Sequence, residues 1–291
     1  ILFLPQIDGK AVRTIEGIKN HKVQDKMVEF HGSQCGFCTP GFITSMVAAN
    51  INGDKDHNAT LAGNLCRCTG YESIVKAARA AENEKKPAWV DEDFKKLSDM
   101  PKSGSKKLPK SKQELAEILN KEPNTRLIAG ATDIGLWVNK DFQKFQNIAF
   151  LSQVSDFSDI DEQPEAWHVG AGITIEKLRG WASVKAPSFA KLLTRYGSTQ
   201  VRNAATLGGN IANGSPIGDS APALIAMETE LVLRNSKGQR KIKLENFFLD
   251  YKKQDLNKGE FLEYFIIPKK NIATKCYKIS KRFDQDISSV C

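Results

Sequence analysis

The sequence predicts a multidomain fold, in which an all-α bundle of four short helices built around cysteines precedes a larger α+β domain. Three observations predict it. Four of the six cysteines form two tight pairs within residues 35–68. Apolar residues at helical spacing flank both pairs. After a lysine-rich segment, residues 108–270 mix strand-like runs, helical segments and glycine-bearing turns, as α+β domains do.

Length and composition limit the classes of protein to which the chain can belong. Its 291 residues suffice for two domains, and 41% hydrophobic residues suit a globular fold. The net charge is +8, but many lysines fall in residues 85–121 without an RNA or DNA module, so we expect no nucleic-acid partner. No apolar run is long enough to span a membrane, so we expect no membrane partner. The cysteine spacing suits metal rather than disulfides, which indicates a cytoplasmic protein.

The first domain, residues 21–84, is predicted as four helices. Thr39 can cap a helix that accepts Pro40 in its first turn and ends at Gly53. Both cysteine pairs then lie just before helix N-termini, where free N–H groups favour negative charge. The other helices are expected at His21 to Phe30, Asn58 or Thr60 to Leu65, and Tyr71 to about Asn83.

The two cysteine pairs carry the strongest chemical signal. Cys35 and Cys38 form a Cys-x-x-Cys loop, and Cys66 and Cys68 form a Cys-x-Cys turn. Each pair can bring two thiolates to one metal atom, so together they supply the four thiolates that a [2Fe–2S] cluster needs. Four cysteines also suit a tetrahedral zinc site, and free cysteines can pack as small hydrophobic residues, so these two interpretations stay open.

The residues around the pairs resemble a known family. They read Cys35-Gly-Phe-Cys-Thr-Pro-Gly-Phe and Cys66-Arg-Cys-Thr-Gly-Tyr. Both are similar to the helical [2Fe–2S] domain of the molybdenum hydroxylases, which include xanthine dehydrogenases, aldehyde oxidoreductases and carbon monoxide dehydrogenases. The resemblance implies that this cluster is the one nearest the molybdenum cofactor. It also implies that the iron ligands are Cys35, Cys38, Cys66 and Cys68.

Residues 1–20 contain a hairpin signal, Asp8-Gly9, between two short extended runs. By the same resemblance they are a remnant of a plant-type ferredoxin domain, which would hold a second [2Fe–2S] cluster with its own cysteines. No cysteine precedes Cys35 and the first residue is not Met, so we expect the rest of that domain to lie outside this sequence. The mass of the intact protein tests this expectation.

Residues 85–107 are predicted as a linker between the domains. Pro, Gly, Ser and Lys are frequent there, and apolar residues are few. Trp89 and Phe94 are the residues expected to pin the linker to a neighbouring surface.

The second domain, residues 108–270, is predicted to be α+β. A helix begins at Ser111, where Ser-Lys-Gln-Glu forms a capping box. A strand from Arg126 runs into a turn at Gly130 that can cradle a diphosphate, although a plain structural turn has the same pattern. Further strands are expected at residues 167–175, 230–234, 240–244 and 261–267.

Small and polar residues dominate the stretch that follows Arg202, as far as about Asp219. This composition does not suit an ordinary core helix or strand. It predicts a tightly folded loop that lies against a polar ligand.

That stretch and the turn at Gly130 are similar to the FAD-binding domain of the molybdenum hydroxylases, a fold of the vanillyl-alcohol-oxidase and CO dehydrogenase flavoprotein type. The resemblance implies that Tyr196 packs on a ring face of FAD. Ala131 and Asn213 depart from residues common in the family, but both are small or polar. The implied FAD-binding residues are Arg126, Leu127, Ile128, Ala129, Gly130, Ala131, Thr132, Asp133, Ile134, Tyr196, Thr206, Gly209, Asn210, Asn213, Ile217, Gly218, Asp219, Leu262 and Lys278.

Residues 271–291 resemble the start of the family's small C-terminal flavoprotein domain. Lys278 aligns with a lysine that approaches the flavin, and Asp284 and Asp286 fall near the loop that faces the nicotinamide dinucleotide. The chain stops before such a domain could form a core, so we expect its remainder to lie outside this sequence. The other two cysteines, Cys276 and Cys291, lack metal spacing and are expected to be structural.

The joined cluster and flavin domains resemble the small subunit of a bacterial xanthine dehydrogenase. The resemblance implies an oxidoreductase subunit that passes electrons from a large molybdenum-cofactor subunit through [2Fe–2S] to FAD and then to NAD. The partner would oxidise hypoxanthine or xanthine to urate, within a higher heteromer such as (αβ)2. No catalytic residue is expected in this chain, because substrate oxidation would belong to the partner. None of the four histidines has a partner pattern either: His21, His31, His57 and His168.

Three alternatives stay open. One is the subunit of an aldehyde oxidoreductase, of another purine hydroxylase or of a CO dehydrogenase-type enzyme. Another is a non-enzymatic zinc-binding scaffold with a nucleotide-binding domain, which would contain zinc and no acid-labile sulfide. The third is a stand-alone flavin oxidase, whose flavin a substrate would reduce without any partner.

Overall fold

The computed structural model describes residues 2–100, 108–251, 253–271, 274–284 and 286–289. The chain divides into two compact units, residues 7–103 and residues 1–6 with 104–291. No helix of the described residues has the length and the apolar character that crossing a membrane requires.

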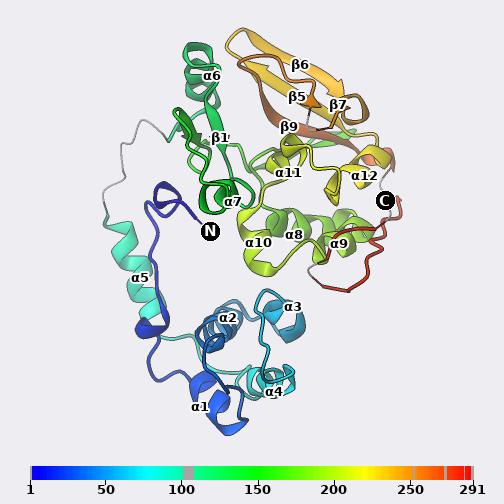
Figure 1. Cartoon of the computed structure of the whole chain (residues 1–291). Helices are drawn as coiled ribbons and strands as arrows, with labels where there is room; N and C mark the ends of the chain where they lie inside the picture. The colour runs from blue at the N-terminus through cyan, green and yellow to red at the C-terminus, as the bar shows by residue number, and fades with distance from the viewer. Residues whose placement is uncertain (1, 101–107, 252, 272–273, 285, 290–291) are drawn as a thin grey trace. The chain divides into compact units, whose positions relative to one another are not determined.

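The smaller unit is an all-α bundle, as the sequence predicts (Figure 1). Its core contains the fully buried side chains of Val23, Phe42 and Ile74, which come from three different helices. Met46 and Leu61 add to the same core. The four helices are α1 (Lys22–Glu29), α2 (Thr39–Asn52), α3 (His57–Leu61) and α4 (Glu72–Ala80).

Local sequence explains where these helices begin and end. His21 caps α1, because its ring Nδ1 accepts a hydrogen bond from the backbone N–H of Val23 at 3.3 Å. Helix α2 ends at Gly53, whose φ of 71° is a left-handed conformation that glycine adopts without strain. His57, for which the sequence offers no partner, lies buried with its Nε2 3.2 Å from Glu82.

The predicted linker contains a helix, α5 (Trp89–Ser98). The guanidinium of Arg13 lies 4.1 Å from the centre of the Trp89 ring, and it forms a two-pronged ion pair with Asp93 at 2.8 Å. These contacts hold the helix to the segment before α1, so this part of the linker is ordered. Trp89 is pinned as expected, whereas Phe94 is 69% exposed. Residues 101–107 of the linker lie outside the described residues.

The hairpin predicted near Asp8-Gly9 has no strands. The turn forms, with Gly9 at φ 72° and a hydrogen bond from Lys10 N–H to the carbonyl of Ile7, but the described flanking residues are not paired as strands. A short 3₁₀ helix, η1 (Leu4–Gln6), precedes the turn instead. Residues 2–6 pack on the larger unit, where Phe3 lies edge-on to Phe150 with ring centres 6.0 Å apart.

The larger unit contains a five-stranded antiparallel sheet in the order β3-β4-β9-β5-β6. Two-stranded sheets join β1 with β2 in parallel and β7 with β8 antiparallel. The strand expected at residues 167–175 ends at Gly170, because Thr174 caps the next helix. The strands are β1 (Arg126–Ile128), β2 (Ile148–Phe150), β3 (Ile160–Glu162), β4 (Ala166–Gly170), β5 (Glu230–Asn235), β6 (Gly238–Lys243), β7 (Phe248–Asp250), β8 (Lys253–Gln254) and β9 (Phe261–Pro268).

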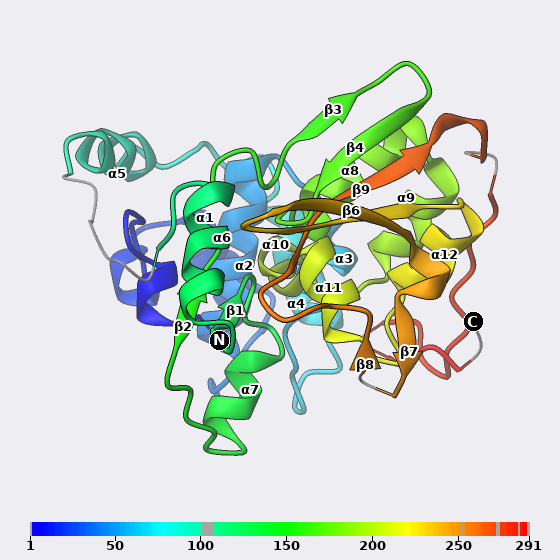
Figure 2. The ribbon, with the colours of Figure 1, turned by 90° about the horizontal axis from the view of Figure 1, so that it is seen from above.

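Helices complete an α+β domain around this sheet, as the sequence predicts. Figures 1 and 2 show α11 and α12 next to the β5–β6–β9 part of the sheet, with α8, α9 and α10 beyond them. One continuous core joins the layers and includes Leu178, Phe189, Leu224 and Phe265. The helices are α6 (Lys112–Lys121), α7 (Ile134–Asn139), α8 (Ile175–Lys185), α9 (Pro187–Thr194), α10 (Thr199–Ala204), α11 (Leu207–Asn213) and α12 (Ser220–Ala226).

The small, polar stretch after Arg202 is not the loop that its composition predicts. It contains α11, and Arg202 itself lies in α10. Thr206 starts α11 by accepting a hydrogen bond from Gly209 N–H at 3.1 Å. Gly208 lets α11 approach its neighbours, because a Cβ there would lie 2.6 Å from the carbonyl oxygen of Ala171. The small residues here therefore allow a helix to pack closely against its neighbours, and they do not indicate a loop.

Candidate functional site

The four predicted iron ligands lie in two loops of the smaller unit. Cys38 is the residue directly before α2, and Cys68 precedes α4 by a short turn. The second turn is held by Tyr71, whose hydroxyl accepts a hydrogen bond from Cys66 N–H at 3.1 Å. Tyr71 itself has a φ of 72°, a left-handed conformation that is uncommon outside glycine.

The thiols of the two loops meet in pairs, Cys38 with Cys66 and Cys35 with Cys68. The hydroxyl of Thr69 lies 3.1 Å from the sulfur of Cys66, and this contact lowers the pKa of the Cys66 thiol to about 7. Within the described part of the chain, no three His, Cys, Asp or Glu side chains group to hold a single metal ion. Four thiols in two pairs fit a [2Fe–2S] cluster, which takes four thiolates over two iron atoms.

A cavity of about 1010 Å³ lies in the larger unit. It is lined by Arg126 and Leu127 of β1, the turn after this strand, residues of α10 and α11, the start of β9 and part of the segment after residue 274. Every implied FAD-binding residue lines this cavity except Ile128. Ile128 is 2% exposed and packs with Phe150 in a separate buried cluster instead.

The turn after β1 is shaped by close packing. A Cβ on Gly130 would lie 2.0 Å from the backbone oxygen of Ala204, so only glycine fits there. Ala131 follows with a φ of 58°, which is unusual for a residue with a side chain. The buried side chain of Gln6 donates a hydrogen bond to the carbonyl oxygen of Ala129 at 2.9 Å. The glycine contact and this hydrogen bond hold the turn from two sides.

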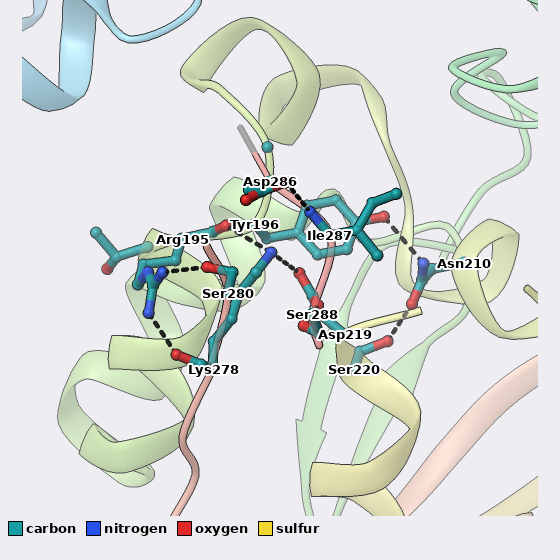
Figure 3. Close-up of polar contacts among 12 residues, drawn as sticks. Arg195, Tyr196, Asn210, Asp219, Ser220, Lys278, Ser280, Asp286, Ile287 and Ser288 are labelled. Carbon is teal, nitrogen blue, oxygen red and sulfur yellow. Dashed lines mark hydrogen bonds and ion pairs between the residues drawn. The ribbon is translucent and has the colours of Figure 1, made fainter. Parts of the chain in front are cut away.

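Two groups of hydrogen-bonded side chains lie in the cavity wall (Figure 3). In the first, Asn210 donates a hydrogen bond to the Tyr196 hydroxyl at 3.0 Å and accepts one from Ser220. Burial, together with the charges of Asp133 and Asp219, raises the pKa of the Tyr196 hydroxyl, so it stays neutral at ordinary pH.

In the second, Asp219 lies between two partners. Its carboxylate binds the ammonium of Lys278 at 2.7 Å and the hydroxyl of Ser288 at 2.6 Å. Arg195 holds the same C-terminal segment by donating to the carbonyl of Lys278 at 2.5 Å and to the hydroxyl of Ser280 at 2.7 Å (Figure 3). The segment after residue 274 is thus fastened beside the cavity.

Some predicted residues are not at the cavity, and some cavity residues were not predicted. Asp286 lines the cavity but Asp284 does not. Cys276 is half-buried and belongs to the larger unit, whereas Cys291 lies outside the described residues. The sequence analysis did not predict Trp137, which lines the cavity from α7. An aromatic residue in the helix after a diphosphate-binding turn could have indicated it. Other lining residues were also not predicted, among them Gln143, Leu151, Phe157, Gln254, Leu256 and Glu260.

The donor set of the cavity fits FAD. A tight glycine turn offers close backbone approach, and amide and hydroxyl groups from α11 and its cap suit phosphate and ribityl oxygens. Tyr196 offers an aromatic face, and Leu262 offers an apolar contact. The lining thus combines polar groups with aromatic and apolar side chains, as a ligand with a charged diphosphate and flat rings requires.

Comparison with known proteins divides the chain in the same way. Residues 106–270, more than half of the chain, match the family described as "FAD binding domain in molybdopterin dehydrogenase". Residues 14–79 match the family described as "[2Fe-2S] binding domain".

Curated relatives are similar over nearly the whole chain. "Xanthine dehydrogenase 1" of Arabidopsis thaliana is 28% identical over 99% of this chain and 28% of its own length. "Xanthine dehydrogenase/oxidase" of Rattus norvegicus is 29% identical over 96% of this chain and 26% of its own length. The chain therefore spans about a quarter of the length of these relatives.

Solved structures share the fold. A Cu,Mo-CO dehydrogenase superposes with a TM-score of 0.56 at 21% identity, over 62% of this chain and 65% of that chain. The quinoline 2-oxidoreductase of Pseudomonas putida 86 superposes with a TM-score of 0.56 at 24% identity, over 62% of this chain and 64% of that chain.

Proposed function

The chain belongs to the molybdopterin dehydrogenase family, and from this premise we propose that it is an electron-transfer component of a molybdenum hydroxylase. One observation carries the proposal. The same chain holds four thiols arranged in two pairs and a separate cavity whose lining suits FAD. A chain with both sites can pass electrons between an iron–sulfur cluster, which transfers one electron at a time, and a flavin, which can transfer two.

The chain's own residues bind and orient the two cofactors. Cys35, Cys38, Cys66 and Cys68 would hold iron, and the Thr69 hydroxyl beside Cys66 would tune the electron density on that sulfur. The glycine turn and α11 would hold the diphosphate, and Tyr196 would lie against the flavin ring. When bound, the cluster supplies single-electron transfer and FAD supplies hydride transfer.

The finer proposal is a xanthine dehydrogenase. A large subunit with the molybdenum cofactor would oxidise hypoxanthine or xanthine to urate, and NAD would accept the electrons at FAD. This chain would be the small subunit of a bacterial enzyme of (αβ)2 type in the cytoplasm. The names of the curated relatives support this substrate, although the matched region is only 26–28% of the length of each relative. Substrate binding would belong to the large subunit.

The first experiment is a visible absorption spectrum of the purified protein, before and after anaerobic dithionite. We expect flavin bands above a broad iron–sulfur absorption, and both should bleach. Metal analysis should give iron with an equal amount of acid-labile sulfide. Zinc without sulfide would overturn the cluster assignment and favour the scaffold alternative.

A second experiment tests the finer proposal. The protein is co-expressed with its genomic neighbours and purified, and the complex is analysed for molybdenum. Xanthine should then bleach the flavin and the cluster in the complex but not in the isolated chain. Bleaching by a substrate in the isolated chain would instead indicate a stand-alone flavin oxidase. Bleaching of the complex by an aldehyde but not by xanthine would replace the proposed substrate.

A further inference from the structure

Arg202 is a buried charge that does not line the FAD-type cavity. The residue is only 4% exposed, and it lies in α10. A buried charge is costly unless its hydrogen-bonding groups are paired, so its partners indicate what the side chain does.

The guanidinium of Arg202 binds the main chain of the turn between α9 and α10. One nitrogen, Nη1, donates to the carbonyl oxygen of Thr194 at 3.1 Å and to that of Gly197 at 3.3 Å. These two carbonyls lie on either side of Tyr196. Because the guanidinium is a flat and rigid fork, contacts on both sides of Tyr196 fix the path of the backbone through that residue.

The turn needs this support. Gly197 has a φ of 52°, and a Cβ there would lie 3.0 Å from Val201. Both Tyr196 and Gly197 line the cavity, so the turn is part of its wall. A change in the backbone at this turn would therefore change where the Tyr196 ring lies.

Glu176 of α8 seats Arg202. Its carboxylate oxygen accepts a hydrogen bond from Arg202 Nε at 2.7 Å. Burial alone would raise the pKa of Glu176, but hydrogen bonds from Arg179 and Arg202 outweigh burial and lower that pKa. The carboxylate is therefore charged at neutral pH and holds the guanidinium in place.

Tyr196 is held from its other end by Asn210, which donates to the phenol oxygen at 3.0 Å (Figure 3). The ring is thus set by two supports, one on its backbone and one on its hydroxyl. Asn210 lines the cavity and can touch a ligand, whereas Arg202 acts only through the turn.

We propose that Arg202, seated on Glu176, is a positioning residue for the flavin, which sets the turn that places the Tyr196 ring in the cavity wall. This inference rests on the proposed binding of FAD. It assigns to Arg202 no contact with the cofactor and no part in proton or electron transfer.

The test uses three variants of the full chain: Arg202→Lys, Arg202→Met and Arg13→Met. Arg13 is the matched control, because it also loses a paired guanidinium, but one that binds Asp93 at 2.8 Å in the smaller unit. FAD affinity is measured by titration of flavin fluorescence, and the setting of the bound ring is measured by visible circular dichroism. Both Arg202 variants should weaken FAD binding by about tenfold or more and change the dichroism, because a charged hydrogen-bond donor is lost or misplaced. The control should keep the wild-type spectrum.

The wild-type titration separates the two proposals. If the wild-type chain binds no FAD, the proposed function fails before the variants are compared. If the wild type binds FAD and both Arg202 variants give the wild-type affinity and dichroism, the positioning role is overturned.

A double-mutant cycle covers a folding defect in Arg202→Met. If Arg202 acts through Tyr196, Arg202→Lys should have little further effect on FAD affinity in a Tyr196→Ala background. An equal effect of Arg202→Lys in both backgrounds would contradict the proposal, because it would show a general structural role.

Discussion

The ammonium of Lys278 lies 2.7 Å from a carboxylate oxygen of Asp219, and the two side chains are only 4% and 8% exposed (Figure 3). Removing one partner of such a pair leaves the other charge buried and unpaired, which costs about 3–5 kcal/mol. Asp219→Asn should therefore destabilise the larger unit, as measured by urea unfolding followed by tryptophan fluorescence. Asp219→Asn combined with Lys278→Met should recover part of the lost stability. If the double variant is as unstable as the sum of the single ones, the two groups are not coupled.

Gly130 touches the backbone of Ala204 so closely that a methyl group has no room. Gly130→Ala should displace the turn after β1 and abolish detectable FAD binding, as measured by retention of yellow flavin through gel filtration. Gly180→Ala is the matched control, because a Cβ at this exposed position in α8 meets nothing within 4 Å. That control should gain up to about 1 kcal/mol in helix stability and keep its flavin. Normal flavin content in Gly130→Ala would show that the turn does not bind the cofactor.

Each of the four loop cysteines is expected to hold iron. Replacing any one with serine should lower iron and acid-labile sulfide together and remove the electron paramagnetic resonance signal of the reduced protein. Cys276→Ser serves as the control, because this half-buried thiol lies outside the two loops, and it should keep full iron content. An unchanged iron content in Cys38→Ser or Cys66→Ser would contradict the assignment of these residues.

Gln6 links the segment before the smaller unit to the carbonyl of Ala129. Gln6→Ala removes the donor and leaves a carbonyl unpaired, so FAD affinity should fall by about fivefold, the equivalent of a typical hydrogen bond. Gln24→Ala is the matched control, because Gln24 accepts from His21 N–H in the smaller unit. The control should lower the stability of the bundle and leave FAD affinity unchanged, as measured by isothermal titration. Equal FAD affinity in both variants would show that the hydrogen bond of Gln6 does not support the FAD-binding turn.

Glu260 lines the cavity, and Arg240 binds its carboxylate at 2.8 Å. Burial raises the pKa of Glu260, but the hydrogen bonds from Arg240 and Asn257 outweigh it, so the pKa in the folded protein is lowered. The stability from this carboxylate is complete above its unfolded pKa of about 4.3 and is lost as pH falls through the lower folded value. Glu260→Gln should therefore lose less stability than the wild type between pH 5 and pH 3. Unfolding free energies from urea titration are compared for the two proteins across this range. If they fall in parallel with pH, the Glu260 carboxylate does not have the lowered pKa in the folded protein.

Motifs that are local in sequence could be predicted without a structure. The two cysteine turns, the glycine turn at Gly130 and the four helices of the bundle depend on neighbouring residues, so short-range patterns suffice for them. The end of α2 at Gly53 is a further local feature that the sequence predicts. The caps at His21 and Thr206 are local too, but the sequence patterns used here do not predict them.

Contacts between distant segments could not be predicted in this way. Gln6 and Ala129 are 123 residues apart, and Arg13 and Asp93 are 80 residues apart, so no periodicity joins them. The helix α11 was missed because its glycines and asparagines lower helix propensity, while tertiary packing against Ala171 stabilises the helix. The partners of Arg202 likewise depend on how three helices meet.

Residues 1–6 belong to the larger unit, and the chain re-enters that unit at residue 104. The [2Fe–2S] unit is therefore joined to the flavin unit at two points, covalently through the linker and non-covalently through the packing of Phe3 and Gln6. Attachment within one chain keeps the local concentration of one cofactor near the other high and independent of dilution. A single proteolytic cut in the linker would therefore leave only the ring contact of Phe3 and the hydrogen bond of Gln6 to hold the two fragments together.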